Sequence, residues 1–142
     1  MNASELLFNM PGPRQILVIS LSRYLRGQPL REILDKNWEA YPNELPRFKN
    51  VPFDFDGNDI PTALQDLKST IKACTWDGIL IGWCIRGYPE RTNLLEEVIS
   101  VYTKAIRKND AGTKLMFCTG PDNLADATLR NFPKEAQEVL QS

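Results

Sequence analysis

The chain has 142 residues, 42% of them hydrophobic and 25% charged, with 17 basic against 18 acidic side chains and a net charge of −1. This balance lacks the strongly basic surface of a nucleic-acid or anionic-membrane binder, and the length suits one domain over 1–142. No apolar run reaches the roughly 18 residues of a membrane span, and 1–13 lacks a signal-peptide pattern, so we expect a cytoplasmic protein.

Two strands and two helices are predicted in the first half of the chain. The apolar, β-branched run over 15–20 predicts a strand, and the helical spacing of apolar residues over 29–41 predicts a helix. Segment 48–55 predicts a second strand, which Pro52 places at the edge of a sheet because proline cannot donate to a ladder. A capped amphipathic helix is expected over 60–74.

The second half of the chain repeats this alternation. A continuous apolar run predicts a strand over 78–85, covered on both faces, and the longest helix is expected over 90–108. A further strand is expected over 113–119 and a helix over 120–132. Segment 134–142 predicts a short final helix or a frayed tail.

Four alternations of strand and helix indicate an α/β fold: a small, doubly wound three-layer sandwich with a parallel sheet of about four strands. In such sheets ligands bind beyond the carboxyl ends of the strands. A site is therefore expected in the loops that follow the strands, over 20–27, 54–59, 83–90 and 118–123.

Known cofactor and metal motifs are absent or altered. The chain has no histidine, GxGxxG or GxxxxGK[ST], which disfavours catalytic triads, zinc sites and nucleotide loops. Loop 20–27 is too bulky for an FMN phosphate, the Cys84 loop has Glu90 where a cysteine phosphatase needs Arg, and 54–65 lacks EF-hand spacing, so Asp59 is expected to cap a helix. The three cysteines are expected to be buried thiols, and neither cofactor nor metal is expected.

Residues near the end of the 78–85 strand form the first part of the candidate site. Arg86 can bind a carbonyl, carboxylate or oxyanion over the sheet; the alternative is an ion pair with Glu90. Trp83 and Tyr88 can wall an apolar pocket, although core packing is the alternative for Trp83. Cys84 lies in the same loop, and Gly87 is either a turn residue or an opening for a ligand.

Two other loops contribute the rest of the candidate site. Arg23 and Tyr24 follow the first strand and are expected to face Arg86, unless they are solvated loop side chains. Thr119 and Asp122 lie at the start of a predicted helix. The Thr119 hydroxyl and the helix N-terminus suit a polar ligand head, or they serve simple capping.

The segment from 76 to 132 resembles a family of small flavodoxin-like proteins that is common in filamentous fungi. The shared pattern is "DG-hydrophobic-IG-x-x-IR-x-x-PE", followed by "GxKLxFNTxPxDxxDAxxR". The matching residues are Asp77, Gly78, Ile81, Gly82, Ile85, Arg86, Pro89, Glu90, Gly112, Lys114, Leu115, Phe117, Thr119, Pro121, Asp126, Ala127 and Arg130. Cys118 replaces the family's usual Asn, and segment 23–48 does not align.

Members of this family occur beside natural-product biosynthetic genes, so the resemblance implies a small-molecule enzyme of secondary metabolism. Cofactor-free cyclases, Diels–Alderases among them, need no histidine, because a pericyclic reaction transfers no proton to the protein. We therefore expect a hydrophobic substrate, polarised by Arg86 and Tyr88 as catalytic residues, covered by Arg23 and Tyr24 and walled by Trp83.

Two other functions stay open at this stage. The chain can be a non-catalytic flavodoxin-like module that binds a metabolite or a protein, or a flavin or nucleotide protein. A homodimer is also left open, with sheet-to-sheet pairing discouraged by Pro52 at the edge.

Overall fold

The computed structural model describes residues 12–106 and 112–134, in which four strands form one all-parallel sheet. The strands are β1 (Arg14–Ser20), β2 (Phe48–Asp54), β3 (Gly78–Ile81) and β4 (Lys114–Phe117), in the order β2-β1-β3-β4. This is the flavodoxin-like strand order, whose switch point lies between β1 and β3. The predicted α/β class and parallel sheet are confirmed.

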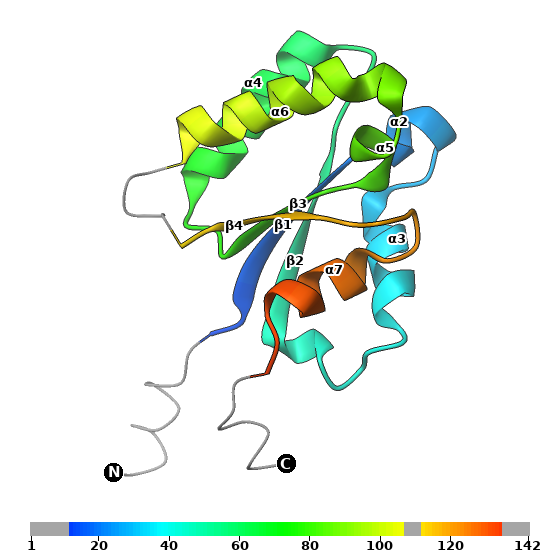
Figure 1. Cartoon of the computed structure of the whole chain (residues 1–142), viewed down its shortest axis with the longest axis vertical. Coiled ribbons are helices and arrows are strands. Elements are labelled where there is room, and N and C mark those ends of the chain that lie inside the picture. The colour runs from blue at the N-terminus through cyan, green and yellow to red at the C-terminus, as the bar shows by residue number, and fades with distance from the viewer. Residues whose placement is uncertain (1–11, 107–111, 135–142) are drawn as a thin grey trace.

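Two pairs of longer helices cover the two faces of the sheet (Figure 1). Helices α4 (Ile60–Ala73) and α6 (Thr92–Ala105) pack together on one face, and α3 (Leu30–Trp38) and α7 (Leu124–Asn131) on the other. Two short helices, α2 (Ser22–Arg26) and α5 (Trp83–Arg86), lie at the carboxyl ends of the strands. Single 3₁₀ turns occur at Leu45–Arg47 and Pro89–Arg91.

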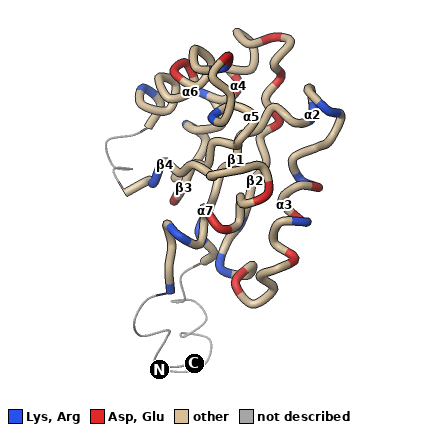
Figure 2. The backbone as a smooth tube through the Cα atoms, turned by 45° about the vertical axis from the view of Figure 1, so that its right-hand side comes forward, with Lys and Arg blue, Asp and Glu red and all other residues tan. Residues whose placement is uncertain are grey.

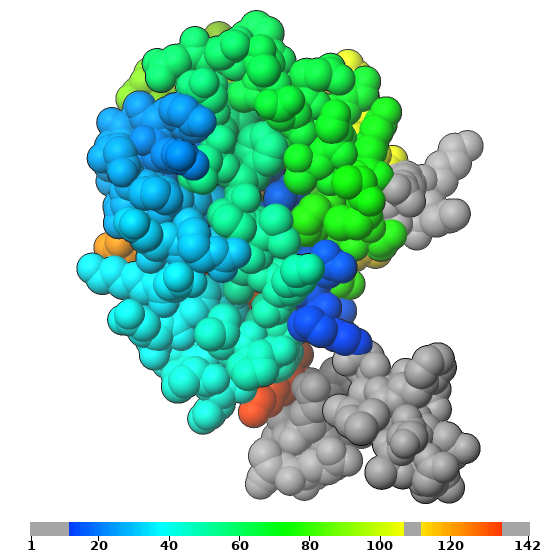
Figure 3. Space-filling model, turned by 180° about the vertical axis from the view of Figure 1, so that it is seen from behind, coloured from blue at the N-terminus to red at the C-terminus, as the bar shows by residue number. Residues whose placement is uncertain are grey.

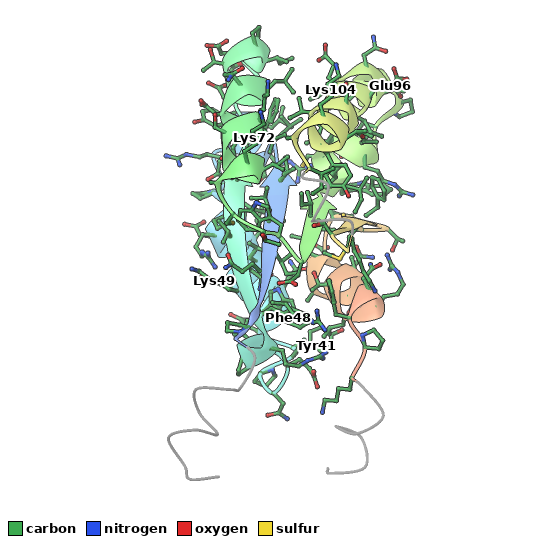
Figure 4. All side chains as sticks on the ribbon, turned by 90° about the vertical axis from the view of Figure 1, so that its left-hand side faces the viewer. Tyr41, Phe48, Lys49, Lys72, Glu96 and Lys104 are labelled. Atoms are coloured by element: carbon green, nitrogen blue, oxygen red, sulfur yellow. The ribbon has the colours of Figure 1, made fainter. Side chains whose placement is uncertain are left out.

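The sheet divides the core into two apolar layers, and Figure 4 draws the side chains on the strands and helices. Successive β1 side chains point to opposite faces, so Leu17 and Ile19 pack under α4 and α6, and Ile16 and Val18 under α3 and α7. All four are fully buried. Coverage of both faces explains the continuous apolar runs in the central strands.

Strand β2 lies at one edge of the sheet, as Pro52 predicted. Pro52 is opposite Val18 of β1, and its missing N–H removes no ladder bond on the open side of the strand. From behind, segment 48–54 lies at the surface between α3 and α4 (Figure 3). The helix over 60–74 is also confirmed, with Asp59 Oδ1 accepting the N–H of Thr62 at 3.4 Å.

The expected strand over 78–85 is wrong in its second half. Strand β3 ends at Ile81, and residues 83–86 form the helical turn α5. The N–H of Gly82 donates to the Ile19 carbonyl at 2.8 Å, and the N–H groups of Ile85 and Arg86 then turn back to the Gly82 carbonyl. Apolar residues therefore continue past the strand because a buried turn follows it.

Other boundaries also differ from the prediction. The expected loop over 20–27 contains α2, and the helices expected over 29–41 and 120–132 are shorter, as α3 and α7. The helix expected over 90–108 is shorter in the structure: α6 covers Thr92–Ala105, and residues 90–91 belong to the preceding 3₁₀ turn. Residues 107–108 and the tail over 135–142 lie outside the described residues. Within 12–106 and 112–134, none of the helices combines the length and the apolar character that a bilayer crossing requires.

Candidate functional site

Two glycines at the carboxyl edge of the sheet are closely packed against their neighbours. A Cβ on Gly82 would lie 2.8 Å from the Ile19 carbonyl oxygen, and one on Gly87 would lie 2.2 Å from the Trp83 ring. Neither contact leaves room for a side chain. The predicted turn role of Gly87 is therefore a packing requirement, since the Trp83 ring occupies the space beside it.

A polar cavity of about 180 Å³ lies at the β1/β3 switch point, on the face covered by α3 and α7. We define this polar cavity by its main polar wall residues, Ser20, Ser22, Arg26, Lys36, Trp83 and Asp122, which come from the β1 end, α2, α3, α5 and the β4–α7 loop. Cys84 and Gly82 complete the wall next to the sheet. Three predicted site residues, Trp83, Cys84 and Asp122, are thereby brought together.

An apolar cavity of about 340 Å³ lies on the other face, between α2, the β2–α4 loop and the start of α6. We define this apolar cavity by its five hydrophobic wall residues, Leu21, Tyr24, Leu25, Ile60 and Leu94. Its rim carries Asn58, Glu90, Arg91, Asn93 and Glu97. Tyr24 is 44% exposed and Leu25 is 48% exposed, so the cavity includes an exposed hydrophobic patch.

Arg86 connects α5 to the end of β4. Its Nη1 donates to the Cys118 carbonyl at 3.3 Å, and its guanidinium lies 5.5 Å from the centre of the Trp83 ring. The described residues contain no ion pair between Arg86 and Glu90. Arg86 is not among the residues that line the two cavities, so its predicted catalytic role stays a prediction.

Tyr88 is linked to the apolar cavity through Arg91. The Arg91 guanidinium lies 4.7 Å from the centre of the Tyr88 ring, and its Nη1 donates to the Cys84 carbonyl at 2.7 Å. These two contacts hold the Arg91 side chain at the rim of the cavity. Tyr88 is half-buried beneath it and does not line either cavity.

The expected cover of Arg86 by Arg23 and Tyr24 is replaced by other contacts. Arg23 Nη1 lies 3.7 Å from the Asp54 Oδ2 at the end of β2, and Asp54 Oδ1 accepts the N–H of Leu30. Tyr24 lines the apolar cavity instead. The cause is α2, which turns successive side chains of the expected loop to different sides.

Thr119 takes part in a closed turn before α7. Asn123 Oδ1 accepts the N–H groups of Thr119 and Gly120 at 3.1 Å, and Asn123 Nδ2 donates to the Thr119 hydroxyl. The side chain of Asn37 caps the helix itself, with Oδ1 accepting the N–H of Leu124 at 3.0 Å. These contacts match the capping alternative for Thr119.

Cys118, the residue that departs from the family pattern, is a buried thiol at the end of β4. Burial raises the pKa of this thiol above its usual range, and the nearby Arg86 offsets only part of that effect. The thiol therefore stays protonated at neutral pH, and a thiolate nucleophile is disfavoured at this position.

Several cavity residues were missed by the sequence reasoning. Arg26 and Lys36 of the polar cavity, and Leu25, Ile60 and Leu94 of the apolar cavity, were assigned no role in a site. One signal was present in the expected loop over 20–27. Leu21, Tyr24 and Leu25 have i, i+3, i+4 spacing, which is the spacing of one face of a helix.

Among the described residues, no three Cys, Asp or Glu side chains lie close enough together to hold a metal ion. Comparison of the chain with models of known protein families, with curated protein sequences and with solved structures gives no match. The two cavities and their chemistry are therefore the features of the structure that bear on function.

Proposed function

We propose that the protein binds an apolar small molecule in the apolar cavity and acts on it as a cofactor-independent enzyme, by cyclisation or rearrangement. The observation that carries the proposal is the cavity itself, with about 340 Å³ between five hydrophobic side chains at the carboxyl edge of the sheet. This volume is at the lower end of the ~300–1,000 Å³ of small-molecule pockets. The resemblance of 76–132 to a fungal family with members beside natural-product biosynthetic genes supports the same direction.

The wall and the rim supply different parts of the chemistry. Leu21, Ile60 and Leu94 can hold a flexible apolar chain in a folded conformation, which removes entropy from the barrier to ring closure. The Tyr24 hydroxyl makes no hydrogen bond within the described residues, and Arg91 is held at the rim by Tyr88 and Cys84. Both groups can donate to a substrate carbonyl oxygen and withdraw charge from it.

A pericyclic closure suits this arrangement. The three π-bonds of the diene and the alkene become two carbon–carbon σ-bonds and one new π-bond between the central diene carbons. All of these changes lie within the substrate, so no proton passes to the protein. A hydrogen bond from Tyr24 or Arg91 to an activating carbonyl lowers the barrier without an acid or base. Arg86 and Tyr88, the catalytic residues expected from the sequence, position the cavity in this scheme through α5 and Arg91.

Binding is tested with the neutral, apolar dye N-phenyl-1-naphthylamine, whose fluorescence rises in an apolar environment. Leu25→Glu puts a charge into the cavity wall and is expected to weaken dye binding by about threefold to tenfold, because the charge at this 48% exposed position stays partly solvated. Leu45→Glu is the matched control, because Leu45 is also exposed, at 41%, and does not line the cavity. Equal binding by both variants would contradict the proposal.

Catalysis is tested with a panel of acyclic trienones in which a diene and an activated alkene are joined by a flexible chain. The expected product has the same mass as the substrate, a different chromatographic retention and no diene absorbance. Its formation should fall in Tyr24→Phe and in Leu25→Glu. Dye binding without any such conversion across the panel would favour the alternative function, a non-catalytic module that binds a metabolite.

A further inference from the structure

We infer that the polar cavity is a second binding site, which takes a small oxyanion, a carboxylate or phosphate group, between Arg26 and Lys36. The site lies on the opposite side of α2 from the apolar cavity, and the two cavities share no wall residue. This second site is therefore independent of the proposed function.

The first observation is the charge of the cavity. Arg26 and Lys36 both line it, and neither forms an ion pair or a side-chain hydrogen bond within the described part of the chain. Four other arginines have carboxylate partners: Arg14 pairs with Asp77, Arg23 with Asp54, Arg31 with Asp35 and Arg47 with Glu44. Three more, Arg86, Arg91 and Arg130, donate to backbone carbonyls instead. Two unpaired cations at one cavity attract an anion.

The second observation is a buried donor. Ser20 is 5% exposed and Ser22 is 2% exposed, and both line the cavity. Ser22 Oγ donates to the Gln28 carbonyl at 3.0 Å, whereas Ser20 Oγ accepts the N–H of Ser22 at 3.1 Å. The Ser20 hydroxyl proton is left without an acceptor among the described residues. Burial of an unused donor costs free energy, which a bound oxyanion recovers.

Trp83 supplies another donor to the same space. Its ring is half-buried in the wall and is fixed by Arg86 and by Gly87, which has no side chain to displace it. The indole N–H has no acceptor within the described residues, whereas the indole N–H of Trp76 donates to the Thr70 carbonyl. An oxyanion in the cavity gives Trp83 the acceptor that it lacks.

The remaining polar groups set the sign and the size of the ligand. Asp122 is the one carboxylate among the wall residues. Together with the cations Arg26 and Lys36, it gives the wall a net charge of +1. Asn37 is already used, since Nδ2 donates to the Ile33 carbonyl and Oδ1 accepts from Leu124. About 180 Å³ is well below the ~300 Å³ at which drug-sized pockets begin, which suits a single acid group with few further atoms.

The test follows the indole N–H resonances of the three tryptophans by ¹⁵N–¹H NMR, during titration with inorganic phosphate and, separately, with acetate. Ionic strength is held constant with sodium chloride, and Trp83→Phe assigns the signals. We expect a saturable shift of the Trp83 signal, with Trp76 and the buried Trp38 unchanged. Tighter binding of acetate identifies a carboxylate ligand, and tighter binding of phosphate identifies a phosphate ligand.

Three variants test the role of the charges. Arg26→Gln is expected to weaken binding about tenfold, as for loss of a charge-assisted hydrogen bond, and Lys36→Gln by about threefold to tenfold. Asp122→Asn is expected to tighten it by about threefold, because a repelling charge is removed. Arg31→Gln is the control, with the same charge change at a side chain bonded to the Asn50 carbonyl and paired with Asp35.

Three results would overturn the inference. The first is no saturable shift of the Trp83 signal with either anion. The second is an equal loss of affinity in Arg31→Gln and Arg26→Gln, which would show only a general effect of net charge. The third is weaker anion binding in Asp122→Asn, which would mean that the carboxylate does not repel the bound ion and that the positive charge of the wall does not select it.

Discussion

The two ends of the sheet differ in the partners of their positively charged side chains. At the amino end, Phe132 lies between the Arg14 guanidinium, 4.9 Å from the ring centre, and the Lys114 ammonium, at 5.0 Å. Arg14 also pairs with Asp77, and Lys114 Nζ donates to the Asn131 carbonyl. Arg47 pairs with Glu44 at 2.7 Å and donates to the Phe132 carbonyl. Every one of these cations is used by the fold.

At the carboxyl end, space and charge are left unused by the fold. Both cavities lie there, and Arg26 and Lys36 have no partner within the described residues. Figure 2 shows basic residues at both ends of the molecule, and the two ends differ in the partners of these residues. We therefore propose that the amino end stabilises the sheet and that the carboxyl end binds ligands.

The largest predicted effect concerns the amino end. Phe132→Ala removes a buried ring that also packs 6.0 Å from Phe48, centre to centre, and should lower the free energy of unfolding by about 3–5 kcal/mol. Chemical denaturation measures this loss. Dye binding to the folded fraction should be unchanged, and a variant with normal stability and lost binding would break the division between the two ends.

Glycines at the two ends of β3 give the second comparison. A Cβ at Gly82 meets the Ile19 carbonyl, whereas a Cβ at Gly78 meets the ends of the Met116, Ile16 and Phe132 side chains. Backbone cannot move aside as a side chain can. Gly82→Ala should therefore cost about 2–3 kcal/mol of stability, and Gly78→Ala less. If Gly78→Ala were the more destabilising variant in thermal or denaturant unfolding, the backbone at the switch point would have room for a side chain at Gly82.

The Arg86→Ala variant tests whether Arg86 has a structural or a catalytic role at the carboxyl end. The variant loses one hydrogen bond to the Cys118 carbonyl and the contact with Trp83, for an expected loss of about 1 kcal/mol. Binding of the apolar dye should stay the same, because Arg86 does not line that cavity. A turnover that falls far more than stability would instead return Arg86 to the catalytic role expected from the sequence.

The smallest effect is the pH dependence of Glu44. The hydrogen bond from Arg47 lowers the pKa of this carboxyl below its ordinary 4.5, and Lys134 adds to the shift. The contribution to stability is therefore present above pH 4.5 and is lost as pH falls through the folded-state pKa. It should amount to less than about 1 kcal/mol, as for a partly exposed ion pair.

The measurement for Glu44 compares the wild type with Glu44→Gln in denaturant at several pH values. The stability difference should be present at pH 7 and should vanish in acid. Glu39→Gln is the control, since Glu39 is exposed and forms no ion pair in the described part of the chain. A difference that persists at the lowest pH would assign Glu44 a role other than its charge.

The sequence predicts the sheet well, because its signal is local. Apolar runs mark β1, β3 and β4, and Pro52 places the less apolar β2 at the edge. The signal fails where an apolar run serves a turn: the backbone of Gly82 leaves the sheet after Ile81, although the following Trp83, Cys84 and Ile85 are still apolar. The five residues of α2 were missed because Leu21, Tyr24 and Leu25 show helical spacing over a single turn only, which is too short to separate a helix from a loop.

The candidate site is predicted only in outline. Its place beyond the strand ends follows from the fold class, and Trp83, Cys84, Asp122 and Tyr24 do line cavities there. The partners of charged side chains depend on tertiary contacts that have no local signature. Arg23 and Arg26 are three residues apart on one short helix, and only Arg23 meets a carboxylate.

The most direct test of the division between the two ends is a map of backbone amide shifts in the ¹⁵N-labelled protein, with the apolar dye and with phosphate or acetate. We predict dye-induced shifts in α2, residues 57–60 and residues 90–97, and anion-induced shifts around residues 20–28, 82–84 and 121–124. Residues 14–15, 47–48 and 131–134 at the amino end should not move. Shifts centred on that end, or no saturable shift at the carboxyl end with any probe, would contradict the account.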